Sequence, residues 1–294
     1  MKYGLDIPTA GAYADAHTLA SLAAEAEEAG WDGFFLWDVL FAKDQPTVPV
    51  VDPWIALAAI AIQTHRIRIG AMLTPLPRRR PWQVARQTVA LDHLSNGRLV
   101  FGAGLGYQAL DFTPFSEEYD PKIRAEKLDE GLEVLKGLWS GEPFSFQGNQ
   151  YQIDEVTLLP KPFQSPRIPV WLAGGWPRHK PLRRAARWDG IYLMAANQVT
   201  GEFLTPEEIR EIVTYVKTYR EAAHPFDVAV NGELSPDPGQ RAEMIQRYSE
   251  AGATWWVEVE VPGQSFEEYR ERIQQGPPRV ALTKRILSSQ EVFL

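Results

Sequence analysis

The chain has 294 residues, of which 45% are hydrophobic and 23% charged, with a formal net charge of -8 and no cysteine. This length and composition can bury a large core and lie near the upper size of one domain. The negative charge argues against a nucleic-acid surface, which needs clustered Lys and Arg. The missing cysteines exclude disulfides, thiolate metal sites and a cysteine nucleophile. The longest apolar run, 54–62, has about half the length of a membrane span, and the N-terminus carries no secretion-signal pattern, so we expect a cytoplasmic protein.

The first half of the chain alternates apolar runs typical of strands with amphipathic segments typical of helices. In chain order, the pattern predicts a strand at 3–8, a helix through 19–26 that ends at Gly30, a strand at 32–38, a helix from Asp52 to about Thr64, a strand at 66–74, a helix at 81–95 and a strand in "RLVFGAGLGYQALDF" (98–112). Asp52 before Pro53 is a typical helix start. Gly30 is a typical helix stop.

The second half continues the alternation after one interruption. The pattern predicts a helix that includes 128–139, a hairpin at 145–153 that turns at Gly148 and Asn149, a strand at 169–175, a short helix at 179–187, a strand at 189–196, a helix that begins at Thr205, a strand at 227–234, a helix at 239–251, a strand at 254–261 and a helix at 265–275. Thr205 and Glu208 have the spacing of a capping box.

Eight strand–helix units of about 37 residues each are the pattern of a closed barrel. We therefore predict an α/β fold, a (β/α)8 TIM barrel that forms a single domain over 1–294. The hairpin lies in an insertion between strands 4 and 5, at approximately 107–167. An open doubly wound sheet is the competing architecture. The barrel is favoured because the units continue evenly to eight and the last strand is as apolar as the first.

Three glycines follow the fourth predicted strand, at Gly102, Gly104 and Gly106. A dinucleotide fingerprint needs a different spacing in the first strand–helix turn, and Tyr107 stands where its third glycine would be. In a barrel, glycines at the C-terminal end of a strand let the backbone approach a ligand. They can equally relieve crowding at the rim, and the spacing alone leaves both interpretations open.

Several longer segments resemble the bacterial luciferase-like monooxygenase family, also called luciferase-like flavin-dependent oxidoreductases. They are "GFFLWDVL" (33–40), "RIRIGAMLTPLPRRRPWQVARQTVALDHLSNGRLVFGAGLGYQALDFTPF" (66–115), "RAEKLDEGLEVLKGLWSGEPFSFQGNQYQ" (124–152) and "LLPKPFQSPRIPVWLAGG" (158–175). The segments cover most of 1–195 in the family's order. Beyond about 200, only the barrel pattern is similar.

The resemblance implies a TIM barrel, usually a homodimer, that binds FMN or the 8-hydroxy-5-deazaflavin coenzyme across the C-terminal ends of its strands. The cofactor would then supply the chemistry. The family supports the ring system on a bulge in strand three, often with a non-prolyl cis peptide. The residues implied to bind the cofactor are Trp37, Met72, Leu73, Thr74, Gly104, Gly106, Tyr107, Gly174, Gly175 and Trp176. The glycines, Tyr107 and Trp176 would lie at the phosphate end, near the start of the helix predicted at 179–187.

Asp38 and Tyr107 are the candidate catalytic residues, and a structural role for Asp38 is equally compatible with the sequence. Many family members have a histidine after this aspartate, whereas this chain has Val39, which cannot transfer a proton. Leu105 stands where the luciferases proper carry an arginine. The run 78–80 of three arginines is typical of a solvated or salt-bridged loop, with an anion contact as the alternative.

Two further expectations concern charged side chains. Glu258 and Glu260 share one face of the last strand by the period of two, and we expect at least one to face the barrel interior. The five histidines show neither HxH nor HExxH spacing, so we expect no metal site.

Three functions remain open at this point. The first is a flavin monooxygenase that uses reduced FMN from a separate flavin reductase, together with O₂, on a small organic substrate. The second is a deazaflavin-dependent hydride-transfer oxidoreductase, which Val39 weakens. The third is a flavin-binding protein without turnover. No membrane or nucleic-acid partner is expected, and the sequence does not identify the substrate.

Overall fold

A computed structural model describes residues 1–43, 45–195, 203–221, 224–232, 235, 237–260 and 263–278. Parts of the predicted strands at 189–196, 227–234 and 254–261 lie outside the described residues. The strands of the main sheet are β1 (Lys2–Ile7), β2 (Gly33–Leu36), β3 (Arg68–Ala71), β4 (Thr74–Pro75), β5 (Phe101–Gly104), β8 (Val170–Trp176), β9 (Gly190–Ala195), β10 (Asp227–Gly232) and β11 (Trp255–Val259). All their pairings are parallel.

The sheet closes into a barrel. Its order is β3-β2-β1-β11-β10-β9-β8-β5-β4, so β3 and β4 stand at its two ends. Yet β3 and β4 are two pieces of the one strand predicted at 66–74, separated by Met72 and Leu73. A parallel bridge from Ile69 to Leu99 joins β3 to the segment that leads into β5. The two ends of the sheet therefore meet, and the predicted TIM-barrel class is confirmed.

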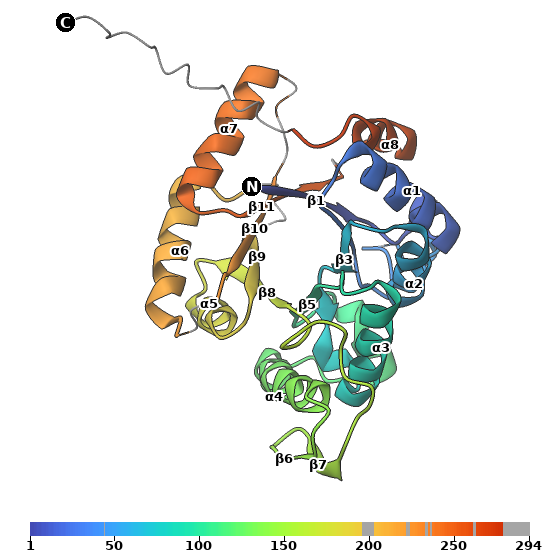
Figure 1. Ribbon diagram of the computed structural model, residues 1–294, viewed down its shortest axis with the longest axis vertical. Helices are drawn as coiled ribbons and strands as arrows, with labels where there is room; N and C mark the ends of the chain where they lie inside the picture. Colours follow the sequence, from blue (N-terminus) through green and yellow to red (C-terminus); the bar gives the residue numbers. More distant parts are fainter. Residues whose placement is uncertain are drawn as a thin grey trace, which may run out of the picture.

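Helices surround this sheet in the order that the sequence predicts (Figure 1). They are α1 (Ala16–Ala29), α2 (Pro53–Gln63), α3 (Pro81–Leu94), α4 (Pro121–Trp139), α5 (His179–Ala186), α6 (Pro206–Tyr219), α7 (Pro238–Ala251) and α8 (Phe266–Gln274). Short 3₁₀ turns are η1 (Gly11–Tyr13), η2 (Leu76–Arg78), η3 (Ala109–Asp111) and η4 (Thr113–Phe115). In the part of the chain that is described, no helix has both the length and the apolar character needed to cross a bilayer.

Local sequence signals set the helix ends as expected. Asp52 accepts hydrogen bonds from the first backbone N–H groups of α2, with Pro53 at the first helical position. Thr205 and Glu208 form the predicted capping box of α6. Gly30 ends α1 in the left-handed conformation, with φ of 93°.

The core has two parts, one on each face of the barrel. Alternate strand residues pack outward against the helices in one large cluster. The interior holds a second cluster: Phe35, Met72, Val100, Trp171, Tyr192, Ala229, Trp255 and Val257. The rings of Phe35, Trp171 and Trp255 lie 5.2–5.9 Å apart, centroid to centroid, and form a plug. The barrel is thus filled below its C-terminal rim.

The predicted hairpin forms between β5 and β8, beyond α4. Its strands are β6 (Phe144–Gln147) and β7 (Gln152–Val156), which pair antiparallel beside α4 at the bottom of Figure 1. The Glu130 carboxylate of α4 accepts hydrogen bonds from the backbone N–H groups of Asn149, Gln150 and Tyr151, at 2.8–3.0 Å. The Glu130 carboxylate therefore holds the turn of the hairpin against α4.

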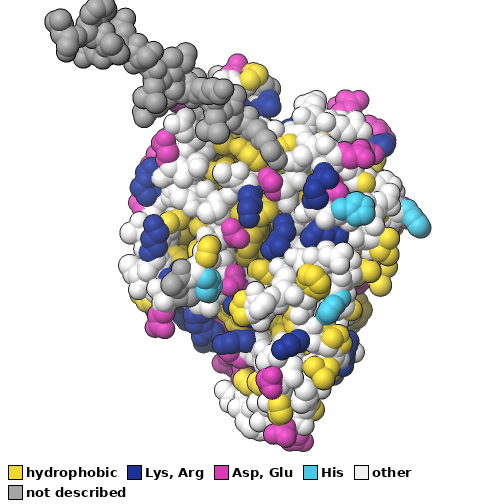
Figure 2. Space-filling view, in the orientation of Figure 1, with side chains coloured by type: hydrophobic (Ala, Val, Ile, Leu, Met, Phe, Trp, Pro, Cys, Tyr) yellow, Lys and Arg dark blue, Asp and Glu magenta, His cyan; other side chains and the backbone are white. Residues whose placement is uncertain are grey.

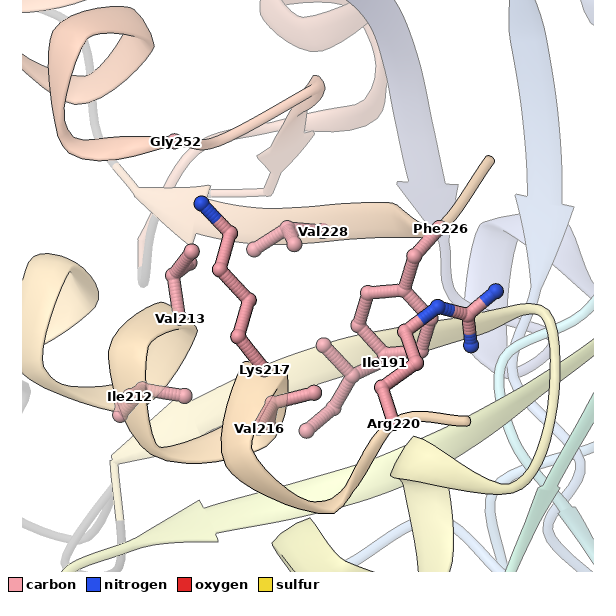
Figure 3. Close-up of a pocket in the computed structure, with 9 residues that line it drawn as sticks. All are labelled: Ile191, Ile212, Val213, Val216, Lys217, Arg220, Phe226, Val228 and Gly252. Carbon is pink, nitrogen blue, oxygen red and sulfur yellow. The ribbon is translucent and has the colours of Figure 1, made fainter. Parts of the chain in front are cut away.

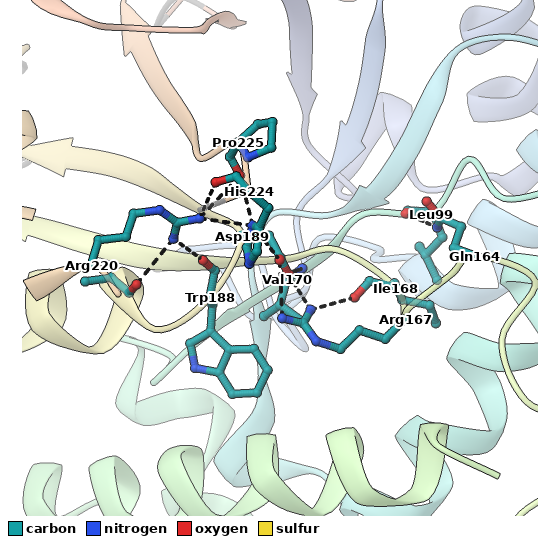
Figure 4. Close-up of polar contacts among 11 residues, drawn as sticks. Leu99, Gln164, Arg167, Ile168, Val170, Trp188, Asp189, Arg220, His224 and Pro225 are labelled. Atoms are coloured by element: carbon teal, nitrogen blue, oxygen red, sulfur yellow. Dashed lines mark hydrogen bonds and ion pairs between the residues drawn. The ribbon is translucent and has the colours of Figure 1, made fainter. Parts of the chain in front are cut away.

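The N-terminal end of the barrel is held by a polar cluster (Figure 4). Asp189, just before β9, accepts hydrogen bonds from the Arg167 guanidinium and from the backbone N–H of Val170 at 2.8 Å. The Arg220 guanidinium, just after α6, donates to the Trp188 carbonyl at 2.7 Å and to the His224 carbonyl at 2.8 Å. Because these groups satisfy one another, this end of the barrel has a stabilising role.

Candidate active site at the C-terminal end of the barrel

The predicted site residues follow neighbouring strands. In the closed sheet, β2 pairs with β3, β4 pairs with β5, and β5 pairs with β8. Because parallel strands end at the same rim, Trp37, Thr74, Gly104 and Gly175 lie around one side of the barrel mouth. The structure thus brings together segments that are more than 130 residues apart in the sequence.

The break between β3 and β4 contains the expected non-prolyl cis peptide, Met72–Leu73. The Met72 side chain packs into the interior cluster, and Leu73 lies beside it. Thr74 pairs with Ala103 of β5 and is fully buried, and its hydroxyl has no hydrogen-bond partner among the described residues. Because paired residues of parallel strands share one face and Ala103 packs in the outer cluster, the Thr74 side chain lies on the side of the sheet that faces the helices.

The facing parts of β5 and β8 present almost no side chains. A Cβ added to Gly104 would lie in ordinary contact with Ala173 and Leu73, at 3.4–3.6 Å, whereas one added to Gly175 would meet no atom within 4 Å. Gly102 is different, since its Cβ would lie 2.3 Å from the Ala71 carbonyl oxygen. Gly102 therefore serves the packing of β3 against β5, and Gly175 borders open space.

The loop after β5 is held from outside by Arg124 of α4. Its guanidinium donates to the Gly106 carbonyl at 2.9 Å and to the Leu105 carbonyl at 3.3 Å. It also lies over the Tyr119 ring. Because the N–H and C=O of a trans peptide point in opposite directions, the N–H groups that follow these carbonyls point away from Arg124. Tyr107 is 65% exposed, and its carbonyl accepts the Tyr119 hydroxyl at 2.7 Å.

The end of β8 turns sharply into α5. The Trp176–Pro177 peptide is cis, and the Arg178 N–H donates to the Gly175 carbonyl at 2.8 Å, which closes the turn. A Cβ on Gly174 would lie 2.5 Å from Ile191, so this glycine faces the packed side of the sheet. Trp176 is half-buried beside His179, with ring centroids 6.0 Å apart. Gly175 and Trp176 thus adjoin the mouth, and Gly174 serves packing.

Asp38 lies in an ionic cluster on the outer side of β2. Its carboxylate accepts the Arg78 guanidinium at 3.0 Å and the Arg79 guanidinium at 2.8 Å, and its side chain is only 1% exposed. The indole N–H of Trp54 donates to it at 3.4 Å. This arrangement agrees with a salt-bridged loop at 78–80, and it favours the structural role of Asp38 over a contact with a ligand.

A second carboxylate, which the sequence reading did not select, lies inside the barrel. Asp6 of β1 accepts the Tyr192 hydroxyl of β9 at 2.7 Å. A usable signal was present, because an aspartate two residues after Gly4 in an apolar strand shares the interior face with it. Gly4 leaves room there for the Phe35 ring, which a Cβ would approach to 3.0 Å.

The expectation for Glu258 and Glu260 was wrong, because both side chains point outward from β11. Glu258 accepts the Arg272 guanidinium of α8 at 2.6 Å, and Glu260 accepts the Tyr13 hydroxyl at 2.9 Å. Burial raises the pKa of Glu258 to about 7, although the Arg272 charge opposes the shift. The interior positions of this strand belong to Trp255 and Val257. The period of two was therefore right, and the choice of face was not.

A cavity of about 280 Å³ lies elsewhere, in the outer layer between α6 and the strands β9 and β10 (Figure 3). Ile191, Val216 and Val228 are among its apolar walls, with Lys217 and Arg220 at its edge. It lies toward the N-terminal end of the barrel, beside the cluster of Figure 4. Within the described ranges, no group of three His, Cys, Asp or Glu side chains could hold a metal ion.

These observations define an α/β barrel with an open, side-chain-poor wall at its C-terminal mouth. The family model of the luciferase-like monooxygenases matches residues 2–276. The chain belongs to this family, which includes flavin- or deazaflavin-dependent oxidoreductases and monooxygenases. The resemblance inferred from the sequence segments is thereby confirmed.

Individual relatives differ in their chemistry. An F420-dependent glucose-6-phosphate dehydrogenase of Nakamurella multipartita is 32% identical over 163 residues, which are 54% of this chain and 47% of that protein. The match thus spans about half the length of that relative. The activity in this name is that of the relative, and about half of the relative lies outside the matched region.

Solved structures share the fold over nearly the whole chain. Monooxygenase RslO1 of Streptomyces bottropensis has a TM-score of 0.75 at 20% identity, covering 94% of this chain and 97% of that one. An F420-dependent secondary alcohol dehydrogenase, in complex with an F420-acetone adduct, has 0.73 at 16%, covering 94% and 98%. The oxygenating constituent of 3,6-diketocamphane monooxygenase from Pseudomonas putida, in complex with FMN, has 0.72 at 16%, covering 94% and 96%.

Proposed function

We propose that this protein is a flavin-dependent monooxygenase that uses reduced FMN and O₂ on a small, mostly apolar organic substrate. The observation that carries the proposal is the bare wall of β5 and β8, where a Cβ on Gly175 would enter open space. A flat ring system can lie against such a wall, with Met72 and Leu73 behind it.

The chain's own residues would divide the work of binding. Gly104, Gly106 and Tyr107 would hold the phosphate end through backbone N–H groups, while Arg124 keeps their loop in place. Trp176 and Gly175 would border the other side. The bound flavin would supply the redox chemistry, and the protein would orient it and exclude water.

The aromatic rings at the mouth support an apolar substrate. Trp37 and Tyr107 are partly exposed there, and Phe41 stacks on Phe115 with centroids 6.2 Å apart. Such a rim binds carbon-rich molecules and keeps solvent away from a reactive cofactor. Reduced FMN would come from a separate reductase.

A deazaflavin-dependent hydride transfer is the second candidate. The similarity to an F420-dependent dehydrogenase over half of this chain favours it. Val39 speaks against it, since the side chain after Asp38 cannot exchange a proton. Both candidate functions place the cofactor at the same mouth of the barrel, so they differ in which cofactor binds and not in where it binds.

We also propose a homodimer formed through α2. Ile55 and Ile62 are 67% and 69% exposed and lie seven residues apart, on one face of this helix. A second copy of the same chain can bury both side chains through a two-fold contact. A second copy packed against α2 would explain why this otherwise well-packed helix exposes two large aliphatic side chains.

The decisive experiment is a titration of the purified protein with FMN and with the deazaflavin coenzyme, each oxidised and reduced, followed by fluorescence. Preferential binding of reduced FMN, with oxygen consumption when substrates are added, is the expected result. Tight binding of the deazaflavin alone would replace the first candidate by the second. Retention of FMN without oxygen consumption would indicate a flavin-binding protein without turnover.

A further inference from the structure

The barrel interior contains a buried carboxylate, that of Asp6, whose two oxygen atoms differ in their hydrogen bonding. Asp6 lies one residue before the end of β1, in register with Phe35 of β2 and Val259 of β11. The residue is only 5% exposed. Its Oδ2 atom accepts the Tyr192 hydroxyl, and its Oδ1 atom is buried without a hydrogen-bond partner among the described residues. A buried acceptor of this kind is costly unless a ligand or a proton satisfies it.

Among the described residues, the side chains that influence Asp6 carry hydroxyl and indole groups. Tyr192 comes from β9 and Trp37 directly follows β2. Asn231 of β10 adjoins the Tyr192 hydroxyl, and the facing positions of β11 are valines. Tyr269 of α8 lies within electrostatic range on the outer side. Asp6 therefore differs from Asp38, whose charge two arginines neutralise.

Burial raises the pKa of Asp6 to about 7, against the opposing effects of Tyr192 and Trp37. A carboxyl group with this pKa is present in both protonation states near neutral pH, so it can donate or accept a hydrogen bond. Asp6 adjoins the Trp37 side chain, which is partly exposed at the mouth.

We propose that Asp6, held by Tyr192, binds an oxygen atom of a neutral alcohol or carbonyl substrate by a hydrogen bond whose direction depends on the protonation state of Asp6. This inference rests on the proposed function, because it concerns the same mouth. In its protonated form Asp6 donates a hydrogen bond from Oδ1 to a carbonyl oxygen. In its charged form the same atom accepts a hydrogen bond from a hydroxyl group, while Tyr192 continues to donate to Oδ2.

The test follows the Asp6 carboxyl directly, by carbon NMR of protein labelled in its aspartate side chains. One signal should titrate near pH 7 and be absent in Asp6→Asn. In Tyr192→Phe its midpoint should rise, because the lost hydrogen bond favoured the charged form. A midpoint near that of ordinary aspartates in the wild type would overturn the proposal.

Ligand addition then tests the contact with substrate. Cyclohexanone, added to the FMN-loaded protein, should raise the midpoint by about one pH unit, equivalent to tenfold tighter binding to protonated Asp6. Methylcyclohexane should not move it. The matched control is Glu258→Gln, which changes the other carboxyl whose pKa is about 7 and should leave the ketone response intact. Identical midpoints with and without ketone would overturn the proposal.

The two proposals fail in different ways. If neither FMN nor the deazaflavin binds the wild-type protein, the proposed function is wrong, and the ketone titration of the protein alone still decides the role of Asp6. If a cofactor binds and cyclohexanone leaves the Asp6 signal unchanged, the proposed function stands and the inference about Asp6 falls.

Discussion

The role of each buried aspartate in this protein depends on the groups that surround its carboxylate. Asp38 is paired with two guanidinium groups. Asp6 accepts the Tyr192 hydroxyl and adjoins the Trp37 indole, and its Oδ1 atom has no hydrogen-bond partner in the part of the chain that the structure describes. Both are aspartates near the ends of neighbouring strands, so their side chains alone do not distinguish them. The side of the strand on which each lies decides which one meets the helices and which one meets the barrel interior.

The first prediction concerns Asp38→Asn. Removing the charge leaves Arg78 and Arg79 without their carboxylate in a largely buried place, so we expect a loss of about 3 kcal/mol of stability. Thermal and urea denaturation measure it. FMN affinity at a temperature where the variant is folded should stay within about twofold, a change below 0.5 kcal/mol. Normal stability with lost turnover would instead make Asp38 a catalytic residue.

The second prediction concerns Glu27, whose carboxylate accepts the backbone N–H groups of His65, Arg66 and Ile67. Burial tends to raise its pKa, but these three hydrogen bonds outweigh the effect of burial and hold the pKa below the usual value of a glutamate. A lowered pKa stabilises the fold above the unfolded-state value and loses this effect as the pH falls through the folded-state value.

Glu27→Gln should therefore cost about 1–3 kcal/mol at neutral pH, and progressively less as the pH falls through the lowered pKa of Glu27. Urea denaturation at several pH values measures the difference between variant and wild type. A difference independent of pH would show that the carboxylate charge is irrelevant here.

At the scale of elements, the site depends on how two adjacent strands end. β5 ends in Gly104, and Arg124 holds the carbonyls of the loop that follows. β8 ends in Gly175 and Trp176, and the Arg178 backbone N–H closes the turn that follows. Gly106 has φ of 75°, so a side chain there would strain the loop itself. Gly175 has ordinary φ and open space, which makes it the better position for a probe of the mouth.

The third prediction is that Gly175→Val abolishes cofactor binding while the fold is retained. The new side chain enters the space assigned to the ring system, and its Cβ meets no protein atom within 4 Å. FMN affinity should fall by more than about tenfold, or 1.4 kcal/mol, with the melting temperature little changed. Gly174→Val is the contrast, because its Cβ would lie 2.5 Å from Ile191 and should destabilise the protein. Undiminished FMN binding in Gly175→Val would place the cofactor elsewhere.

For the whole molecule, the surface is mixed in charge and apolar only in places. On the face shown in Figure 2, basic and acidic side chains are interspersed. A net charge of -8 on the chain keeps copies apart over long distances, so the proposed self-association must come from short-range burial. The exposed Ile55 and Ile62 of α2 provide such a surface.

The fourth prediction is that Ile62→Glu converts the dimer to a monomer, because a charge would be buried at the two-fold contact. Light scattering after size-exclusion chromatography measures the mass. Val156→Glu, on the exposed hairpin strand β7, is the control and should leave the mass unchanged. A wild-type mass equal to one chain would refute the proposed dimer.

Much of the fold was predictable because its signals are local. The helix starts at Asp52 and Thr205 depend on a side chain that bonds its own first turn, and the hairpin turn near Gly148 depends on adjacent residues. The outward direction of Glu258 was not predictable, because alternation assigns residues to two faces without saying which face is inside. The position of Asp6 opposite Tyr192 depends on two strands that are 186 residues apart.

The sequence by itself determined the strand–helix order, the barrel class and the family, because periodicity, capping and motif order are written along the chain. Only the tertiary structure decided that Asp38 is enclosed by Arg78 and Arg79. It also decided that Gly175 borders open space whereas Gly174 does not, and that Asp6 lies in the barrel interior. The physical reason is that burial, neutralisation and open volume are properties of neighbours in space. Closing the barrel chooses those neighbours, and it does so across strands that are distant in the sequence.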